Sequence, residues 1–276
     1  MAKFEIRDGI AIIPEGTTVI EEDTFYDCSS LESVIIPESV TEIGDNAFGR
    51  CASLESITLP DSVASIGWYA FTGCTSLKNI TLPDSVTFLG ENAFSGCTSL
   101  ESITISNSVT RIDHYAFNDC TSLESITIPE SVKDIEVGAF RWCTALESIT
   151  LPESVKVIGW NAFEGCTSLK SITIPESVTE IKGNAFSGCT SLESITLPKS
   201  VTEIEESTFE GCTSLTTVTL PVGVKHISYN AFHECSALST IYVPADKTDY
   251  YKELLPEKLH GKIVELEPEK RTKVRN

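Results

Sequence analysis

Ten cysteines are the residues of this chain whose type and spacing could most readily do chemistry. Every neighbouring pair is separated by 23 residues, from Cys28 to Cys235. Thiols in such numbers could bind zinc, form disulfides or pack as small apolar groups. No C-x-x-C motif or closely spaced Cys/His cluster accompanies them, so we expect no zinc site and no other metal site.

Catalytic chemistry has little support in the remaining residues. The chain has four histidines, His114, His226, His233 and His260, and none stands in a recognisable nucleophile motif. There is no P-loop and no dinucleotide-binding fingerprint. We therefore expect a protein that is not an enzyme and that uses no cofactor.

The cysteine spacing is one of several columns that share the same period. Ten phenylalanines, from Phe25 to Phe232, and ten leucines, from Leu31 to Leu238, also recur every 23 residues. A period of 20 to 50 residues is typical of a solenoid, in which one small unit stacks on the next. We expect about ten such units in an elongated rod or shallow arc.

Stacking also predicts the state of the cysteines. Neighbouring Cα atoms would lie about 5 Å apart, inside the disulfide range of roughly 4.4–6.8 Å. Identical rungs keep their Cβ vectors parallel, however, which leaves the Cβ atoms further apart than the ~3.8 Å that a bridge requires. The slot lies between core positions, where a free cysteine acts as a small hydrophobe. We expect a ladder of buried free thiols.

One repeat, residues 54–76, shows how a rung is built. Ile57 and Leu59 alternate with polar residues as in a short strand, and Pro60 ends it. Apolar residues then follow at spacings of three to four, which predicts an irregular return path with one helical or 3₁₀ turn near Phe71. Stacked rungs would form a parallel sheet along one side.

These units resemble the BspA-like leucine-rich repeats, which read L-x-x-I-x-I-P-x-S-V-x-x-I-x-x-x-A-F-x-x-C. Nine consecutive units from Leu31 to Ala237 match closely, and a looser leading unit ends at Cys28. The resemblance implies a leucine-rich-repeat solenoid that is secreted or displayed on a cell surface, where it serves adhesion or host interaction. We assign residues 1–13 to an N-terminal cap, 14–243 to the solenoid and 244–276 to a C-terminal cap helix and strand with a charged tail.

The composition of the chain disfavours some classes of binding partner. Forty acidic and twenty basic residues give a net charge of −20, which disfavours nucleic acid. No run approaches 18 apolar residues and no apolar leader precedes the repeats, so we expect no membrane insertion and find no export signal. The sequence therefore leaves the cellular compartment undecided between a surface location and the cytoplasm. We expect a monomer.

Two surfaces could carry recognition. The first is the outward sheet face, a nearly uniform hydroxyl array that could match a glycan or protein surface, although Ser and Thr also simply suit exposed strand positions. Its residues include Ser56, Thr58, Ser102, Thr104, Ser125, Thr127, Ser148 and Thr150.

The second surface is the loop after the Ile66-type position, where the repeats differ most. It carries Trp68, Tyr69, His114, Tyr115, Arg141, Trp142 and Trp160. Trp, Tyr and Arg are enriched in binding hot spots, whereas scattered surface aromatics are also common. We expect a non-catalytic binding protein, and the family resemblance implies that its partner is a matrix, host or cell-surface protein. A carbohydrate-binding module and an intracellular interaction scaffold are the alternatives.

Overall fold

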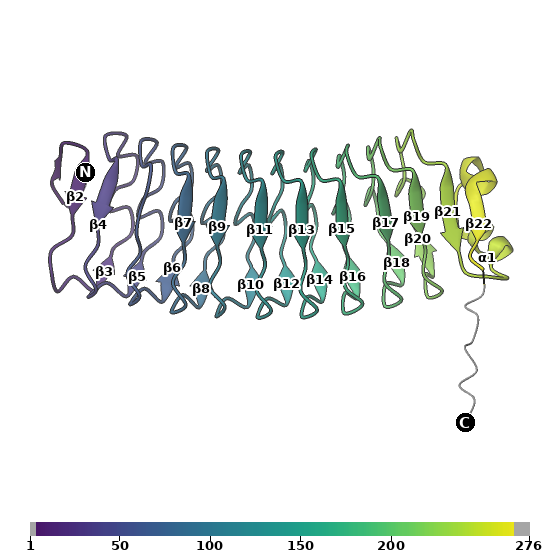
Figure 1. Ribbon diagram of the computed structural model, residues 1–276, viewed down its shortest axis with the longest axis horizontal. Helices are drawn as coiled ribbons and strands as arrows, with labels where there is room; N and C mark the ends of the chain where they lie inside the picture. Colours follow the sequence, from purple (N-terminus) through teal and green to yellow (C-terminus); the bar gives the residue numbers. More distant parts are fainter. Residues whose placement is uncertain (1–3, 268–276) are drawn as a thin grey trace, which may run out of the picture.

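The structure is a computed structural model that describes residues 4–267. Figure 1 shows a long row of similar rungs, with the two ends of the chain at opposite ends of the row. The rungs stack in register, with parallel pairs 23 residues apart such as Ser125↔Ser148 and Thr127↔Thr150. The expected repeat solenoid is confirmed. The predicted charged tail, with Lys270 and Arg271, lies outside the described residues.

The first strip of strands is the expected parallel sheet. Its strands are three residues long in most rungs, and the middle residue of each points into the core. The strip comprises β2 (Ile10–Ile12), β4 (Ser33–Ile35), β7 (Asn79–Thr81), β9 (Ser102–Thr104), β11 (Ser125–Thr127), β13 (Ser148–Thr150), β15 (Ser171–Thr173), β17 (Ser194–Thr196), β19 (Thr217–Thr219) and β21 (Thr240–Val243). It is interrupted at Ser56, where a single bridge to Asn79 replaces a strand.

A second strip of two-residue parallel strands forms at the Ile66-type position. The sequence predicts an irregular return path there, so this strip is an addition to the expectation. The members are β3 (Val19–Ile20), β5 (Glu42–Ile43), β6 (Ser65–Ile66), β8 (Phe88–Leu89), β10 (Arg111–Ile112), β12 (Asp134–Ile135), β14 (Val157–Ile158), β16 (Glu180–Ile181), β18 (Glu203–Ile204) and β20 (His226–Ile227). Both strips satisfy backbone groups between rungs rather than within them.

The rest of each rung is a run of turns that also bonds to its neighbour. Phe71 N donates to Ala93 O at 2.8 Å, and Gly73 N donates to Ser95 O at 2.7 Å. Within the rung, Thr72 N and Cys74 N donate to carbonyls three residues earlier, at 3.0 and 3.2 Å. The expected helical or 3₁₀ turn is therefore a set of separate turns, and no helix forms within the described rungs.

The core is a continuous column rather than a central cluster. The phenylalanine rings from Phe25 to Phe232 stack face to face, with centroids 5.2–5.7 Å apart and planes within 9° of parallel. Leucine, isoleucine and valine columns surround them and are buried in almost every rung. Each rung is too small to bury its own apolar face, so neighbouring rungs supply the missing surface.

Both ends of the column are closed by different structure. At the N-terminal end, β1 (Ile6–Arg7) pairs antiparallel with β2 through the Asp8–Gly9 turn. At the other end, α1 (Thr248–Leu254), a 3₁₀ segment η1 (Glu257–Lys262) and β22 (Ile263–Glu265) cover the last rung. These segments shield strand edges that would otherwise remain open to pairing.

Candidate binding surfaces

The thiols are buried as a ladder, as predicted from the spacing. Nine are buried, and only Cys28, in the first rung at the N-terminal end, is half-buried. Cys74 Sγ donates to the carbonyl oxygen of Phe48 in the preceding rung at 3.1 Å, and the same carbonyl accepts Cys51 N at 3.2 Å. Burial raises the pKa of the Cys97 and Cys189 thiols to about 12. These groups stay protonated, so they are unsuited to nucleophilic or metal chemistry.

The aromatic flank is the name we give to Trp68, Tyr69, His114, Tyr115, Arg141, Trp142 and Trp160. All lie in the turns between the second strip and the cysteine column. The tryptophans are 51%, 44% and 39% exposed at positions 68, 142 and 160, and Tyr69 is 41% exposed. His114, Tyr115 and Arg141 are half-buried. Each large ring therefore presents a substantial part of its surface to a partner.

Most of these rings lie against a glycine of the next rung. A Cβ added to Gly183 would come within 2.1 Å of Trp160 Cζ3, and one added to Gly165 would come within 2.3 Å of Trp142 Cδ1. Tyr115 covers Gly138 in the same way, at 2.4 Å. In each case the glycine lies 23 residues after the ring. The absence of a side chain at the glycine creates the space that holds the ring flat.

Two backbone positions have left-handed conformation in nearly every rung. Tyr69 and Tyr115 have φ of 58° and 54°, at a position that is Asn in several other rungs, and Trp142 has φ of 59° at a position that is usually Gly. Bulky residues with positive φ are uncommon because the Cβ crowds the backbone. Strain of this kind concentrates at functional sites, so three members of the aromatic flank occupy costly positions.

Arg141 connects the flank to its neighbour. Its guanidinium lies 4.1 Å from the centroid of the Trp142 ring, and its Nε lies 2.7 Å from Glu164 Oε2 in the next rung. Nη2 also donates to Glu164 Oε1 at 3.1 Å. The stacking and the ion pair hold Arg141 and Trp142 as one unit.

The flank residues share a side of the solenoid but do not form one pocket. Trp68 and Trp160 occupy the same slot four rungs apart, with Glu91, His114 and Val137 between them. Contacts between aromatic rings in residues 4–267 join phenylalanines to one another and Tyr250 edge-on to Tyr251, and none joins two rings of the aromatic flank. The surface is an extended strip, which suits a broad partner better than a small molecule.

The hydroxyl face points outward as expected. Ser102, Thr104, Ser125, Thr127, Ser148 and Thr150 are exposed on their strands. Ser56 and Thr58 differ, because they lie at the interruption of the first strip and line a hollow of about 410 Å³ with Asn79 and Thr81. This hollow is not predictable from the sequence, since its rung keeps the repeat pattern.

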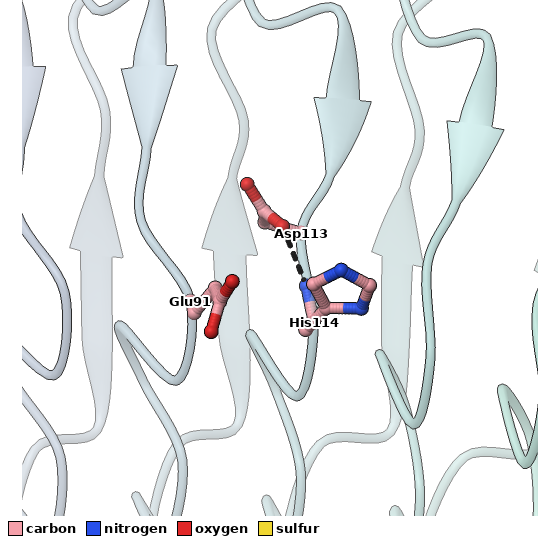
Figure 2. A group of neighbouring side chains, drawn as sticks. All are labelled: Glu91, Asp113 and His114. Atoms are coloured by element: carbon pink, nitrogen blue, oxygen red, sulfur yellow. Dashed lines mark hydrogen bonds between the residues drawn. The ribbon is translucent and has the colours of Figure 1, made fainter.

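Three potential metal ligands lie on the turns of neighbouring rungs (Figure 2), and one of them, His114, is a member of the aromatic flank. Glu91, Asp113 and His114 place one ligand atom each within 4.8 Å of the others. Asp113 is 3% exposed, whereas Glu91 and His114 are half-buried. The group is not apparent in the sequence, because its members come from two repeats. The feature of the sequence that could have indicated the group is Asp113, because its slot holds glycine in several other rungs.

The described residues include no helix that is long and apolar enough to cross a bilayer.

Comparisons with known proteins agree with this architecture. The family model described as BspA type leucine rich repeat region matches residues 18–147 and 133–255. No match is found among curated proteins. Many solved structures match.

Three solved structures illustrate the likeness. The leucine rich repeat protein of T. pallidum is 31% identical over 66% of this chain and 77% of that chain, with a TM-score of 0.54. A leucine-rich repeat protein from Bacteroides ovatus is 28% identical over 94% and 92%, with a TM-score of 0.42. The pneumococcal vaccine antigen PcpA is 23% identical over 86% and 68%, with a TM-score of 0.57. With the 23-residue rung, the thiol ladder and the family match in agreement, this chain belongs to the BspA-type leucine-rich repeat family.

Proposed function

We propose that this chain is a non-catalytic binding protein that recognises a protein partner through the aromatic flank. The observation that carries the proposal is the set of half-exposed rings seated on glycines, at positions 142, 160 and 115. A ring that is already fixed loses little conformational entropy when a partner covers it. Tyrosine, tryptophan and arginine also dominate the energetics of protein interfaces.

The charge of the chain indicates the kind of protein surface that fits. The net charge is −20, and the acidic side chains recur in columns along the rod. Such a surface attracts a basic partner and raises its association rate at low salt. A matrix, host or cell-surface protein with a basic patch beside apolar groups is the partner that we propose, which agrees with a secreted or surface location.

A carbohydrate is the second candidate, because Trp68, Trp142 and Trp160 could act as stacking platforms for sugar rings. Their exposed faces, at 51%, 44% and 39%, support this alternative. The hydroxyl face is a further place where a glycan could bind. An intracellular interaction scaffold is the third candidate and would use the same strip with a different partner.

The test is an array of matrix proteins and glycans probed with three forms of the chain. The first is the wild type. The second is a flank variant, Trp68→Val/Trp142→Gly/Trp160→Val, which uses residue types found in the same slots of other rungs. The third is a sheet variant, Ser125→Ala/Thr127→Val/Ser148→Ala/Thr150→Val, which changes the hydroxyl face alone.

Binding to a protein spot that the flank variant loses and the sheet variant keeps supports the proposal. The converse pattern assigns recognition to the hydroxyl face. Salt separates the remaining candidates: binding to a basic protein weakens steeply as salt rises, whereas stacking on a neutral glycan changes little. No binding by the wild type to any spot contradicts the adhesion role and favours the intracellular scaffold.

A further inference from the structure

We propose that Glu91, Asp113 and His114 form a binding site for one divalent first-row transition-metal ion, with Zn²⁺ the ion that best fits the ligands. One imidazole and two carboxylates are ligand types that Zn²⁺ accepts. This proposal departs from the expectation of no metal site, and it does not depend on the proposed function.

The geometry supports a site that is nearly assembled. The three ligand atoms lie within 4.8 Å of one another. Ligand atoms about 2.1 Å from a zinc ion lie about 3–4 Å apart, so small side-chain rotations suffice to close the site. Glu91 and His114 are half-buried at the surface and have room for such rotations. Figure 2 shows the three side chains on the turns of adjacent rungs.

The solenoid backbone fixes the distance between the two rungs. Asn92 N donates to His114 O at 2.9 Å, directly beside Glu91, and Tyr69 N donates to Glu91 O at 2.9 Å. Glu91 and His114 occupy the same slot in consecutive rungs, so both side chains leave the turn in similar directions. A rigid frame of this kind reduces the ordering cost that a metal site on a flexible loop would carry.

Asp113 occupies a variable slot, which glutamate fills at positions 21, 136 and 205, lysine at 182 and serine at 228. Its slot holds glycine at positions 44, 67, 90 and 159. Its side chain is only 5% exposed, with one oxygen accepting His114 N at 2.9 Å and the other lying 3.1 Å from Arg111 Nε. A carboxylate has about four lone-pair positions, so both oxygens keep acceptor capacity. The bond from His114 N orients the carboxylate, as outer-shell partners orient metal ligands, whereas the Arg111 guanidinium competes with a cation for the other oxygen.

A substitution at Arg111 tests the proposal in the opposite direction, because it is expected to strengthen metal binding. Its positive charge lies beside Asp113 and opposes a cation there. Removing the charge with Arg111→Gln leaves the three ligands in place and should tighten metal binding. A cation that binds the acidic surface nonspecifically would respond about equally to any lost arginine, for which Arg50→Gln is the control, since Arg50 pairs with Asp27 at 3.7 Å far along the rod.

The experiment titrates tag-free, reduced protein, first stripped with a chelator, with Zn²⁺ in a calorimeter and with Co²⁺ in a spectrophotometer. We expect one Zn²⁺ per chain, a loss of at least about tenfold in affinity for His114→Gln, and unchanged binding for the control His233→Gln. His233 is a suitable control because it pairs with Glu210 at 3.0 Å on another part of the turn surface. Arg111→Gln should bind at least about twofold more tightly than Arg50→Gln.

Three results would overturn the proposal: no saturable binding by the wild type, equal binding by wild type and His114→Gln, or a thiolate charge-transfer band with Co²⁺, which would assign the metal to cysteine. A circular dichroism spectrum of each variant establishes that it is folded, and Glu91→Gln, at a half-exposed position, provides a second ligand variant. The triple tryptophan variant keeps all three ligands, so failure of the metal site and failure of the aromatic flank are distinguishable.

Discussion

Alkaline pH should unfold this protein because its thiols are buried in the protonated form. Nine cysteines are buried, and desolvation raises the pKa of Cys51, Cys97 and Cys189 to about 12. In the unfolded chain a cysteine has a pKa of about 8.5. Above that pH the unfolded chain releases protons that the folded chain keeps, so the free energy of unfolding falls as pH rises.

The size of the effect follows from the number of thiols. One pH unit above the unfolded pKa, each buried thiol removes about 1.4 kcal/mol of stability. Nine thiols remove about 13 kcal/mol together, which is comparable with the whole stability of a typical domain of about 5–15 kcal/mol. We therefore expect the solenoid to unfold between about pH 9 and 10, close to where tyrosine and lysine begin to titrate.

The assay is urea unfolding followed by circular dichroism from pH 7 to 9.5, with reductant present throughout. The stability should be flat below pH 8 and should then fall with increasing slope. Cys97→Ala, at a fully buried position, should reduce the limiting slope by about 1.4 kcal/mol per pH unit, whereas Cys28→Ala, at a half-buried position, should reduce it less. Stability that stays constant from pH 8 to 9.5 would refute the reasoning.

Three further predictions concern packing between rungs. Gly183→Ala should destabilise by about 1–2 kcal/mol because its Cβ displaces the Trp160 ring. The cost should fall in a Trp160→Val background to the part that comes from the backbone oxygen of Glu206, 3.0 Å from the added Cβ. Urea unfolding of this double-mutant cycle should give a coupling of about 1 kcal/mol, and additive costs would contradict the contact between Trp160 and Gly183. Trp142→Gly should lower the free energy of unfolding by about 1–2 kcal/mol less than Trp160→Gly does. Of these two positions only 142 has a left-handed backbone, and glycine relieves its strain. Equal costs in urea unfolding would be inconsistent with strain at Trp142. Phe117→Ala in the middle of the ring column should cost about 3–5 kcal/mol, and Phe232→Ala near its end should cost less; the reverse order in thermal unfolding would argue against a continuous core.

The period alone predicts most of the fold, because every rung repeats the same contacts. Ile57 and Leu59 were correctly expected to point inward, and the spacing of the cysteines correctly predicted a buried ladder. The second strip was missed because its strands span only two residues, such as Ser65–Ile66, which is too short for an alternating pattern.

The candidate surfaces were less predictable, because they depend on contacts between rungs. The aromatic residues are visible in the sequence, but the packing of the Trp160 ring against Gly183 depends on the orientation of the ring, which the sequence does not show. The left-handed positions were also missed, although glycine before many of the cysteines was their visible sign. Glu91, Asp113 and His114 converge only when two rungs are stacked.

The most direct test of the account is the affinity of one array hit for the wild type and two variants, each shown to be folded by circular dichroism. We would measure the dissociation constant of the wild type, the flank variant and the sheet variant for that ligand by surface plasmon resonance. The account predicts that the flank variant binds at least about tenfold more weakly, while the sheet variant stays within about twofold of the wild type. Full affinity in the flank variant would contradict it.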